Sequence, residues 1–483
     1  MKNYNSIVFS IGLFMMIFYP YIIRSQEWKE PVNIYSTSSY NHYPTMCIDN
    51  NNIFHCTWSH RITTNHYKIY YSKSTDNGET WSEPEDVCQN EQFWLTEPHI
   101  VSDNQNKLYL TYDHNAGNPA QMLVLMKIYD GTSWSESDTV SVNMPGSDHN
   151  RLVMDNNNRL YCFWFYGLIY YRYFENDVWS EINKPFTGSN ELFYLQRCVA
   201  DTYENLHCIG HHIDFEISDE SRIIYFKNEA GVWSDFTQLS NDISGDSDIA
   251  LDNTNLPHTV WKQNTSNTNP PNDGTFYSCF DGVNWYSPDL IVEDPNHQTI
   301  AIDNQNRVHI VDVEKFENGY RIVHYQKKND DWEGIIVNEN NYTFFDNSLF
   351  YFQNQLFLLY GRVDTVIGVS SQTSIILQAC DLTTGIDEFG SSTFSEFSIF
   401  PNPFKNSATI RYNLNAPAQT SIKIYDLKGT LVNTLSDNHQ PPGHYETIWN
   451  GKDQNGKEVK PGIYLVRLQA GRKVMTRSVE FIK

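Results

Sequence analysis

Basic side chains are scarce in this sequence, which has 34 Lys and Arg residues against 58 Asp and Glu residues. The deficit lies in residues 26–397, which hold 20 basic and 52 acidic side chains, a balance of −32; residues 398–483 hold 12 basic and 6 acidic ones. Nucleic-acid binding needs clustered Lys and Arg against the phosphates. The composition therefore argues against a nucleic-acid partner, and an anionic ligand would need a locally basic spot.

Long apolar runs are also missing after the first 25 residues. Lys2 precedes a mostly apolar stretch from Ile7 to Ile23, and polar sequence begins at Gln26. This layout is typical of a signal peptide over residues 1–25, with a retained membrane anchor as the alternative. No later run approaches the ~20 apolar residues of a membrane helix. We therefore expect an exported, monomeric chain, secreted or at the cell surface, without a membrane span after cleavage.

The cysteine spacings do not form a zinc motif. All eight cysteines lie between Cys47 and Cys380. Export permits disulfides, and two pairs, Cys47 with Cys56 and Cys198 with Cys208, flank hairpin turns. Small buried thiols are nevertheless the preferred interpretation. No metal and no cofactor is expected.

What the sequence has in abundance is an internal repeat. Phrases such as MCIDNNNIFHCTW, IVSDNQNKLYLTY and LVMDNNNRLYCFW each consist of an apolar strand, an Asp-led turn and a second strand. The anchor aspartates of these hairpins are Asp49, Asp103, Asp155, Asp201, Asp252 and Asp303, and a weaker seventh copy has Tyr351 at this place. Six residues after the anchors stand rings to which we assign a structural role: His55, Tyr109, Tyr161, His207, His258 and His309.

A tryptophan follows each hairpin, and the copy at residues 74–81 reads STDNGETW. This phrase matches the Asp box, and the chain thereby resembles sialidase-like BNR-repeat propellers. Residues 28–34 (WKEPVNI) are similar to 81–87 (WSEPEDV), so the first strand is expected to be the outermost strand of the last blade. The sequence predicts an all-β fold with a seven-bladed β-propeller over residues 26–384.

The last part of the chain differs in composition and lacks the propeller phrases. After a linker at residues 385–397, residues 398–483 contain PNPF, IYDLKG, WNGKDQNGK and PGIY. They resemble the type IX secretion C-terminal sorting domain of Bacteroidota, which implies export by that machinery. Alternating strands and tight turns predict a small immunoglobulin-like β-sandwich, with an ordinary adhesion module as the alternative.

Functional residues are expected where the repeats differ. Four residues before the anchors come Thr45, His99, Arg151, Arg197, Asp248 and Thr299, with Asn347 by the weaker alignment. Eleven after them come His60, His114, Tyr166, His212, Gln263, Glu314 and Arg362. These two polar sets are predicted to surround one mouth of the central channel. A merely solvated rim is the alternative.

The predicted ligand is an anionic polysaccharide or glycan. Arg151, Arg197 and Arg362 could pair with a carboxylate or sulfate, and His99, Asp248 and Glu314 complete the predicted ligand-binding set. His114, His149, Tyr166 and His212 are the candidate catalytic residues, because they could move protons near neutral pH.

Two families of enzymes share features with this sequence. Residues 148–167 loosely resemble ulvan-lyase-like propellers, which implies that His, Tyr and Arg would remove a proton beside a uronate carboxylate. A sialidase-type hydrolase is a second possibility, although the Arg-Ile-Pro phrase of that family is missing. The non-enzymatic alternatives are a surface glycan-binding or adhesion protein and a structural surface protein.

Overall fold

The computed structural model describes residues 28–482 except 90, 92–93, 116, 118–120, 187–190, 215–220, 241–242, 264–272, 294, 317–318, 329–330, 341–342, 365–371, 383–393, 415–417, 427–429, 442 and 471–472. The predicted signal peptide lies outside these residues, as does most of the predicted linker. Every named element is a β-strand. In this part of the chain, no helix is long and apolar enough to cross a membrane. The chain divides into two compact units between residues 383 and 384.

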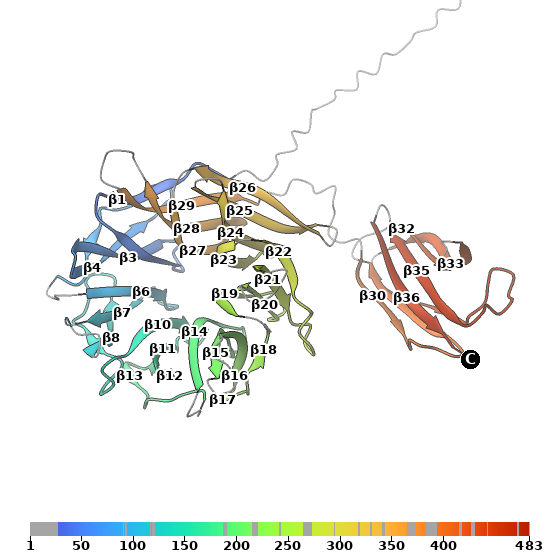
Figure 1. Cartoon of the computed structure of the whole chain (residues 1–483), viewed down its shortest axis with the longest axis horizontal. Helices are drawn as coiled ribbons and strands as arrows, with labels where there is room; N and C mark the ends of the chain where they lie inside the picture. The colour runs from blue at the N-terminus through green and yellow to red at the C-terminus, as the bar shows by residue number, and fades with distance from the viewer. Residues whose placement is uncertain are drawn as a thin grey trace, which may run out of the picture. The chain divides into compact units, whose positions relative to one another are not determined.

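The first unit is a ring of seven antiparallel sheets (Figure 1). In blades 1 to 6 the chain runs from the innermost strand outward. Blade 1 consists of β2 (Asn41–Ile48), β3 (Phe54–Thr63), β4 (His66–Ser74) and β5 (Glu85–Asp86). Blade 2 consists of β6 (Trp94–Ser102), β7 (Leu108–Asn115), β8 (Leu123–Tyr129) and β9 (Asp138–Thr139). Blade 3 consists of β10 (Asp148–Met154), β11 (Leu160–Tyr166), β12 (Leu168–Glu175) and β13 (Val178–Trp179).

The following three blades repeat this order. Blade 4 consists of β14 (Glu191–Ala200), β15 (Leu206–Asp214), β16 (Arg222–Glu229), β17 (Val232–Trp233) and β18 (Thr237–Gln238). Blade 5 consists of β19 (Ser244–Leu251), β20 (Pro257–Gln263), β21 (Gly274–Cys279) and β22 (Asp289–Val292). Blade 6 consists of β23 (Pro295–Ile302), β24 (Val308–Phe316), β25 (Gly319–Lys328) and β26 (Asp331–Asn340).

Blade 7 joins the two ends of the ring. Its three inner strands are β27 (Thr343–Phe352), β28 (Gln355–Asp364) and β29 (Gln372–Asp381), and its outermost strand is β1 (Val32–Thr37). Val32 pairs with Leu377 and Thr37 with Thr373. The seven-bladed fold and the predicted place of the first strand are confirmed. Pairing the first strand with the last blade closes the ring, so the sheet edges are not left open.

The Asp-led turns fasten each hairpin and also join neighbouring blades. The Oδ1 atom of Asp103 accepts hydrogen bonds from the backbone of Gln105 and Lys107 at 2.8 and 2.9 Å. The backbone N–H of Asn104 donates to Asn158 Oδ1 of the next blade at 2.8 Å. Because the anchor carboxylates accept hydrogen bonds within their own turns, their role is structural.

The rings six residues after the anchors are also part of the framework. His207 Nδ1 lies 2.8 Å from the Tyr225 hydroxyl, and its Nε2 lies 3.4 Å from Asp201 Oδ2. His258 contacts Tyr277 and Asp252 in the same way. An Asp–His–Tyr arrangement that repeats from blade to blade fixes the strands rather than defining one reaction centre.

The Asp box of blade 1 is a turn as well. Asp76 Oδ1 accepts hydrogen bonds from Ser74 Oγ at 2.7 Å and from the Thr80 N–H at 2.9 Å. Gly78 has a φ of 87°, and a Cβ there would lie 2.4 Å from Leu377 Cδ2. The positive φ therefore favours glycine at this place of the motif, and a larger residue would also displace the Leu377 side chain.

Blade 7 departs from the predicted alignment by one residue. Its first hairpin closes through a two-residue turn at Gln353 and Asn354, both with positive φ, and Tyr351 pairs with Leu356 inside the hairpin. Tyr351 is therefore not an anchor. The register places Ser348, rather than the expected Asn347, at the position of Thr45.

The C-terminal unit is the expected β-sandwich. One sheet contains β30 (Phe394–Phe400), β31 (Ala408–Leu414) and β34 (Gly443–Trp449); the other contains β33 (Leu431–Gln440), β32 (Ala418–Tyr425), β35 (Gly462–Ala470) and β36 (Lys473–Phe481). Ile410, Trp449 and Val466 are fully buried between the sheets. The strand β30 begins at Phe394, inside the stretch that the sequence assigned to the linker.

Candidate functional site

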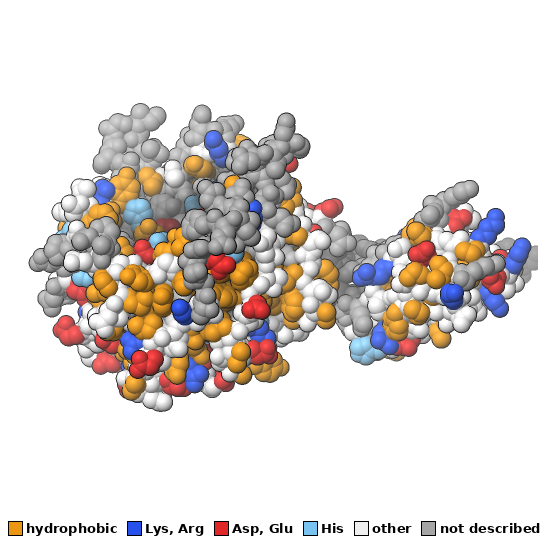
Figure 2. Space-filling view, turned by 60° about the horizontal axis from the view of Figure 1, so that its bottom comes forward, with side chains coloured by type: hydrophobic (Ala, Val, Ile, Leu, Met, Phe, Trp, Pro, Cys, Tyr) orange, Lys and Arg blue, Asp and Glu red, His pale blue; other side chains and the backbone are white. Residues whose placement is uncertain are grey.

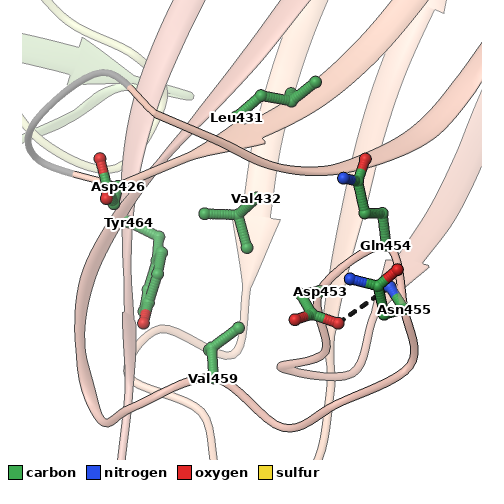
Figure 3. A pocket seen from close by; sticks show the side chains of 8 residues that line it. All are labelled: Asp426, Leu431, Val432, Asp453, Gln454, Asn455, Val459 and Tyr464. Atoms are coloured by element: carbon green, nitrogen blue, oxygen red, sulfur yellow. Dashed lines mark hydrogen bonds between the residues drawn. The ribbon is translucent and has the colours of Figure 1, made fainter.

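A groove in the C-terminal domain is the first place to consider. It encloses about 280 Å³ and is lined by Asp426, Leu431, Val432, Asp453, Gln454, Asn455, Val459 and Tyr464 (Figure 3). Asp453 Oδ1 accepts hydrogen bonds from the backbone of Asn455 and Lys457 at 2.9 and 3.0 Å. Asp426 Oδ1 accepts one from the Thr430 N–H at 2.8 Å. Since these carboxylates cap their own turns, the groove gives little basis for chemistry.

The propeller offers a richer arrangement where its innermost strands begin. Each of these strands has a register shift at this end, opposite the Asp-led turns. We call the residues at this irregularity the channel lip: Tyr43, Glu97, His149, Leu195, Asp246, His297 and Asp346. Figure 2 shows histidine and acidic side chains gathered in a hollowed part of the propeller surface.

The backbone of the lip is unusual. Five of its members have positive φ, namely Tyr43 (52°), Glu97 (48°), His149 (53°), Asp246 (32°) and Asp346 (47°). Non-glycine residues rarely adopt this region, and β-bulges re-aim side chains next to functional sites. The lip is the ring that the sequence analysis missed, apart from His149. The residues six places before the anchors differ from blade to blade, and this variation in the sequence could have indicated the lip.

A buried carboxylate holds the bulge of His149. Asp113 accepts a hydrogen bond from the His149 N–H at 2.9 Å and one from Asn150 Nδ2 at 2.8 Å. Burial, with the nearby Glu97 carboxylate as a second cause, raises the pKa of Asp113 well above its usual range. Thr111 Oγ1 also donates to Asn150 Oδ1 at 2.5 Å. The strained backbone at His149 is thus stabilised from the neighbouring blade.

His149 itself faces acids and aromatic rings. Its Nδ1 lies 3.0 Å from Asp148 Oδ1 and its Nε2 lies 4.0 Å from Glu97 Oε1. The hydrogen bond to Asp148 raises the pKa of His149, so the imidazolium persists toward neutral pH. The side chain is 49% exposed and remains accessible to a ligand.

Two aromatic rings stand beside His149. Phe165 and Tyr194 stack with their centroids 4.0 Å apart and their planes 18° from parallel. The His149 ring lies 6.3 Å from that of Tyr194. His211 is the register partner of Tyr194 on the next strand, and burial lowers its pKa to about 4. Burial raises the pKa of Tyr194. Tyr194 and His211 were not among the sequence-predicted residues.

Arg151 is held within the protein. It donates to the backbone oxygens of Gln196 and Asn150 at 2.9 and 2.7 Å, and its Nη1 lies 3.3 Å from both Glu97 Oε2 and His99 Nε2. A guanidinium only donates, so His99 accepts with a neutral ring. Burial, then Arg151, lowers the pKa of His99. This arginine therefore joins three blades.

Arg197 is more accessible. Its Nε lies 3.7 Å from Asp248 Oδ1, and its side chain is 41% exposed. The other oxygen of Asp248 accepts hydrogen bonds from Thr299 Oγ1 at 2.7 Å and the Ile300 N–H at 3.1 Å. Asp248 is thus a link between blades 5 and 6, whereas Arg197 keeps donors for a ligand.

The remaining candidates of the outer ring have different surroundings. His212 is buried between the rings of Phe193 and Phe236, each 4.7 Å away, and its Nε2 lies 3.8 Å from Glu191. Tyr166 is 44% exposed, and its ring lies 6.3 Å from that of Tyr170 in a T-shaped arrangement. His114 is half-buried opposite Leu95.

Glu314 and Arg362 lie on the far arc of that ring. Both oxygens of Glu314 are used: Oε2 accepts from Arg321 Nε at 2.8 Å, and Oε1 accepts from the Tyr325 hydroxyl. Arg362 is half-buried opposite Phe344. The structure therefore brings together His149, His99, Arg151 and Arg197, and places Glu314 in an ion pair of its own blade.

A second acid–imidazole pair lies at the lip between blades 5 and 6. His297 Nδ1 lies 3.4 Å from Asp246 Oδ2. The hydrogen bond to Asp246 raises the pKa of His297. Within the described residues, no group of three or more His, Cys, Asp or Glu side chains is placed to hold a metal ion.

These features define a seven-bladed propeller with a polar channel lip, to which a small β-sandwich is attached. Residues 404–473 match the FlgD Ig-like domain family. None of the curated proteins matches the sequence.

Solved propellers are similar in fold. A polysaccharide lyase PL25 ulvan lyase shares 10% identity with a TM-score of 0.56, covering 71% of this chain and 95% of that one. The same type of enzyme bound to -[GlcA(1-4)Rha3S]- shares 10% identity with a TM-score of 0.51, covering 72% of this chain and 93% of that one. A Hadza microbial sialidase shares 12% identity with a TM-score of 0.43, covering 71% of this chain and 66% of that one.

Proposed function

We propose that this chain is a carbohydrate-active propeller that binds an acidic polysaccharide at the channel lip of blades 3 and 4. The observation that carries the proposal is the side chain of Arg197, which is 41% exposed and lies 3.7 Å from Asp248 in an ion pair. It lies on the same strand as Tyr194, which stacks on Phe165. A cation and a flat aromatic surface presented by the same strand suit a sugar that carries a carboxylate or sulfate.

The charge distribution supports an acidic ligand at this point rather than elsewhere on the molecule. Residues 26–397 carry a balance of −32, so most of the surface repels polyanions. At the lip, the raised pKa of His149 adds positive charge near neutral pH. The fold is also that of an ulvan lyase solved with -[GlcA(1-4)Rha3S]-.

The test is a binding panel with the full mature chain. We expect uronate-containing and sulfated polysaccharides to bind, with affinity that falls as salt increases because the contact is ionic. Neutral polysaccharides of the same size should not bind. Equal binding of neutral and acidic chains, or no binding of any, would overturn the proposal.

A second candidate function is cleavage of the bound chain by β-elimination. It is favoured by Tyr194, which contacts His149 and pairs in register with His211. The raised pKa of Tyr194 keeps its phenol protonated, the raised pKa of His149 favours its imidazolium, and the lowered pKa of His211, about 4, favours its neutral imidazole. His149 and Arg197 would neutralise the uronate carboxylate.

In such a step, His211 would take the proton from the carbon beside the carboxylate. The bond to the leaving glycosidic oxygen breaks, a carbon–carbon double bond forms, and Tyr194 donates a proton to that oxygen. Tyr194→Phe should then abolish the ultraviolet-absorbing unsaturated product while binding persists. New reducing ends without unsaturation would indicate a hydrolase, and binding without either product a lectin.

We also propose that the chain is exported, with the C-terminal domain acting as a type IX sorting signal. Support comes from the PNPF, IYDLKG and PGIY phrases and from the signal-peptide layout of residues 1–25. The match to an FlgD Ig-like domain is consistent with the sandwich and does not distinguish sorting from adhesion. Deletion of the C-terminal domain separates the two.

A further inference from the structure

Blade 4 has a glycine where most blades have an aromatic residue in the core of the inner hairpin. Nine residues after the anchor, or at the equivalent place in blade 7, five blades have a buried aromatic residue: Trp58, Tyr112, Trp164, Trp261 and Tyr360. Blade 4 has Gly210, where a Cβ would lie 2.1 Å from the Tyr194 carbonyl oxygen. The hairpin that carries Tyr194 and Arg197 therefore lacks the large side chain that secures its counterparts.

A pair of cysteines lies in the same hairpin. Cys198 and Cys208 are direct register partners on β14 and β15, one pair away from Arg197 and Ile209. Their sulfur atoms are 2.8 Å apart, and both side chains are buried, with exposures of 7% and 0%. Opposed cysteines on adjacent antiparallel strands lie within the reach of a disulfide.

The other pair that the sequence allowed is out of register. Cys47 lies opposite His55, and Cys56 lies opposite Met46. These two cysteines flank a turn in the same way as the blade 4 pair but do not face each other. They therefore serve as a matched control within the same fold.

We propose that Cys198 and Cys208 form a disulfide in the mature protein, a covalent link that secures the strand carrying Arg197. The register of the strands and the contact of the two sulfur atoms carry this proposal, which is independent of the ligand of the channel lip.

The reaction is a thiol–disulfide exchange with a disulfide oxidant. One cysteine thiolate attacks the oxidant to form a mixed disulfide, and the second displaces the oxidant thiol. The sulfur–sulfur bond between Cys198 and Cys208 forms as the sulfur–sulfur bond of the oxidant breaks. The two cysteines lose two protons and two electrons, and the oxidant leaves as two thiols. Burial raises the pKa of Cys208 in the folded blade, so the exchange belongs to folding, while the thiols are still accessible.

The decisive experiment counts thiols in the full mature chain produced in an oxidising compartment. The protein is denatured and alkylated first without and then with reductant. We expect six of the eight cysteines to be alkylated at once, and Cys198 and Cys208 only after reduction. Digestion at Glu204 should leave the two flanking peptides linked. Immediate alkylation of all eight cysteines, or a link between another pair, would overturn the proposal.

Paired variants give a second measurement. Cys198→Ser with Cys208→Ser should lower the Tm by about 2–4 °C, and reductant should lower the Tm of the parent similarly without changing this variant. Cys47→Ser with Cys56→Ser should retain the response to reductant. A parent whose Tm does not respond to reductant would contradict the link even if the serine variants fail to fold.

Discussion

His297 lies with its Nδ1 atom 3.4 Å from the Oδ2 atom of Asp246, the lip residue of the preceding blade. Glu97 and His149 repeat this relationship between blades 2 and 3, at 4.0 Å. Because the bulge places equivalent residues of neighbouring blades side by side, one position supplies both an acid and its partner. The lip thus carries two acid–histidine pairs between neighbouring blades, Glu97 with His149 and Asp246 with His297.

The first prediction concerns the pair of Asp246 and His297. The pKa of His297 is raised, so its stabilising contribution is complete below the usual histidine pKa and is lost as pH rises through the folded value. Asp246→Asn should lower stability at about pH 6 and have little effect at about pH 9. The loss should stay below about 1 kcal/mol, since both groups are partly exposed. Thermal melts across pH measure this, and a loss independent of pH would contradict the pairing.

The second prediction concerns Arg197. Removing its charge in Arg197→Ala should weaken binding of an acidic polysaccharide about ten- to a hundred-fold, the loss of one charge-assisted hydrogen bond. The effect should be larger at low salt. Lys107→Ala, which removes the same charge next to the Asp-led turn of blade 2, is the control. Calorimetry that shows equal losses for both variants would indicate a general charge effect rather than a site.

The third prediction concerns Asp312, a fully buried residue at the place where most blades have an aromatic ring. Burial raises its pKa to about 7, and Thr275 donates a hydrogen bond to it. The folded protein therefore binds a proton that the unfolded chain releases, and stability should fall as pH rises from about 4 to 7.

Asp312→Asn removes this titration. The variant should be more stable than the parent at about pH 8, by on the order of 2 kcal/mol, and the difference should shrink toward about pH 4. Chemical denaturation at the two pH values measures it. A variant that is destabilised equally at both values would show that the carboxyl group is needed for its shape rather than its proton.

The fourth prediction concerns the anchor aspartates. Asp155 Oδ1 accepts hydrogen bonds from the N–H groups of Asn157 and Arg159 at 3.0 and 2.8 Å. Asp155→Ala should reduce stability by on the order of 1 kcal/mol, while Asp155→Asn keeps an acceptor and should reduce it less. Ligand binding should be unchanged in both. Normal melting together with lost binding would place Asp155 in a binding site instead.

The fifth prediction concerns the C-terminal domain. Deleting residues 384–483 removes the whole second unit without cutting a propeller strand. If this domain is a sorting signal, the truncated propeller should accumulate in the periplasm in folded form. Fractionation and antibody labelling of intact cells measure this. Normal surface display of the truncated chain would favour the adhesion alternative.

The propeller could be read from the sequence because its determinants are local. The anchor Asp, the strands on either side of it and the following Trp lie within one repeat, and neighbouring residues make the contacts that define a blade. The Cys pair shows the limit of this reasoning. Two pairs flank turns alike, but only the register of each hairpin decides that Cys198 faces Cys208 while Cys47 faces His55.

By itself, the sequence determined the number of blades, the closure through the first strand and the structural role of the repeated rings. The tertiary structure decided which side chains form the lip, because the bulges occur at Tyr, Glu, His and Asp residues that carry no glycine signal for positive φ. The tertiary structure also decided which charged side chains already form ion pairs within the protein. Glu97, held 54 residues from Arg151 in the sequence, pairs with it only once blades 2 and 3 stand side by side, whereas Arg197 keeps its exposure.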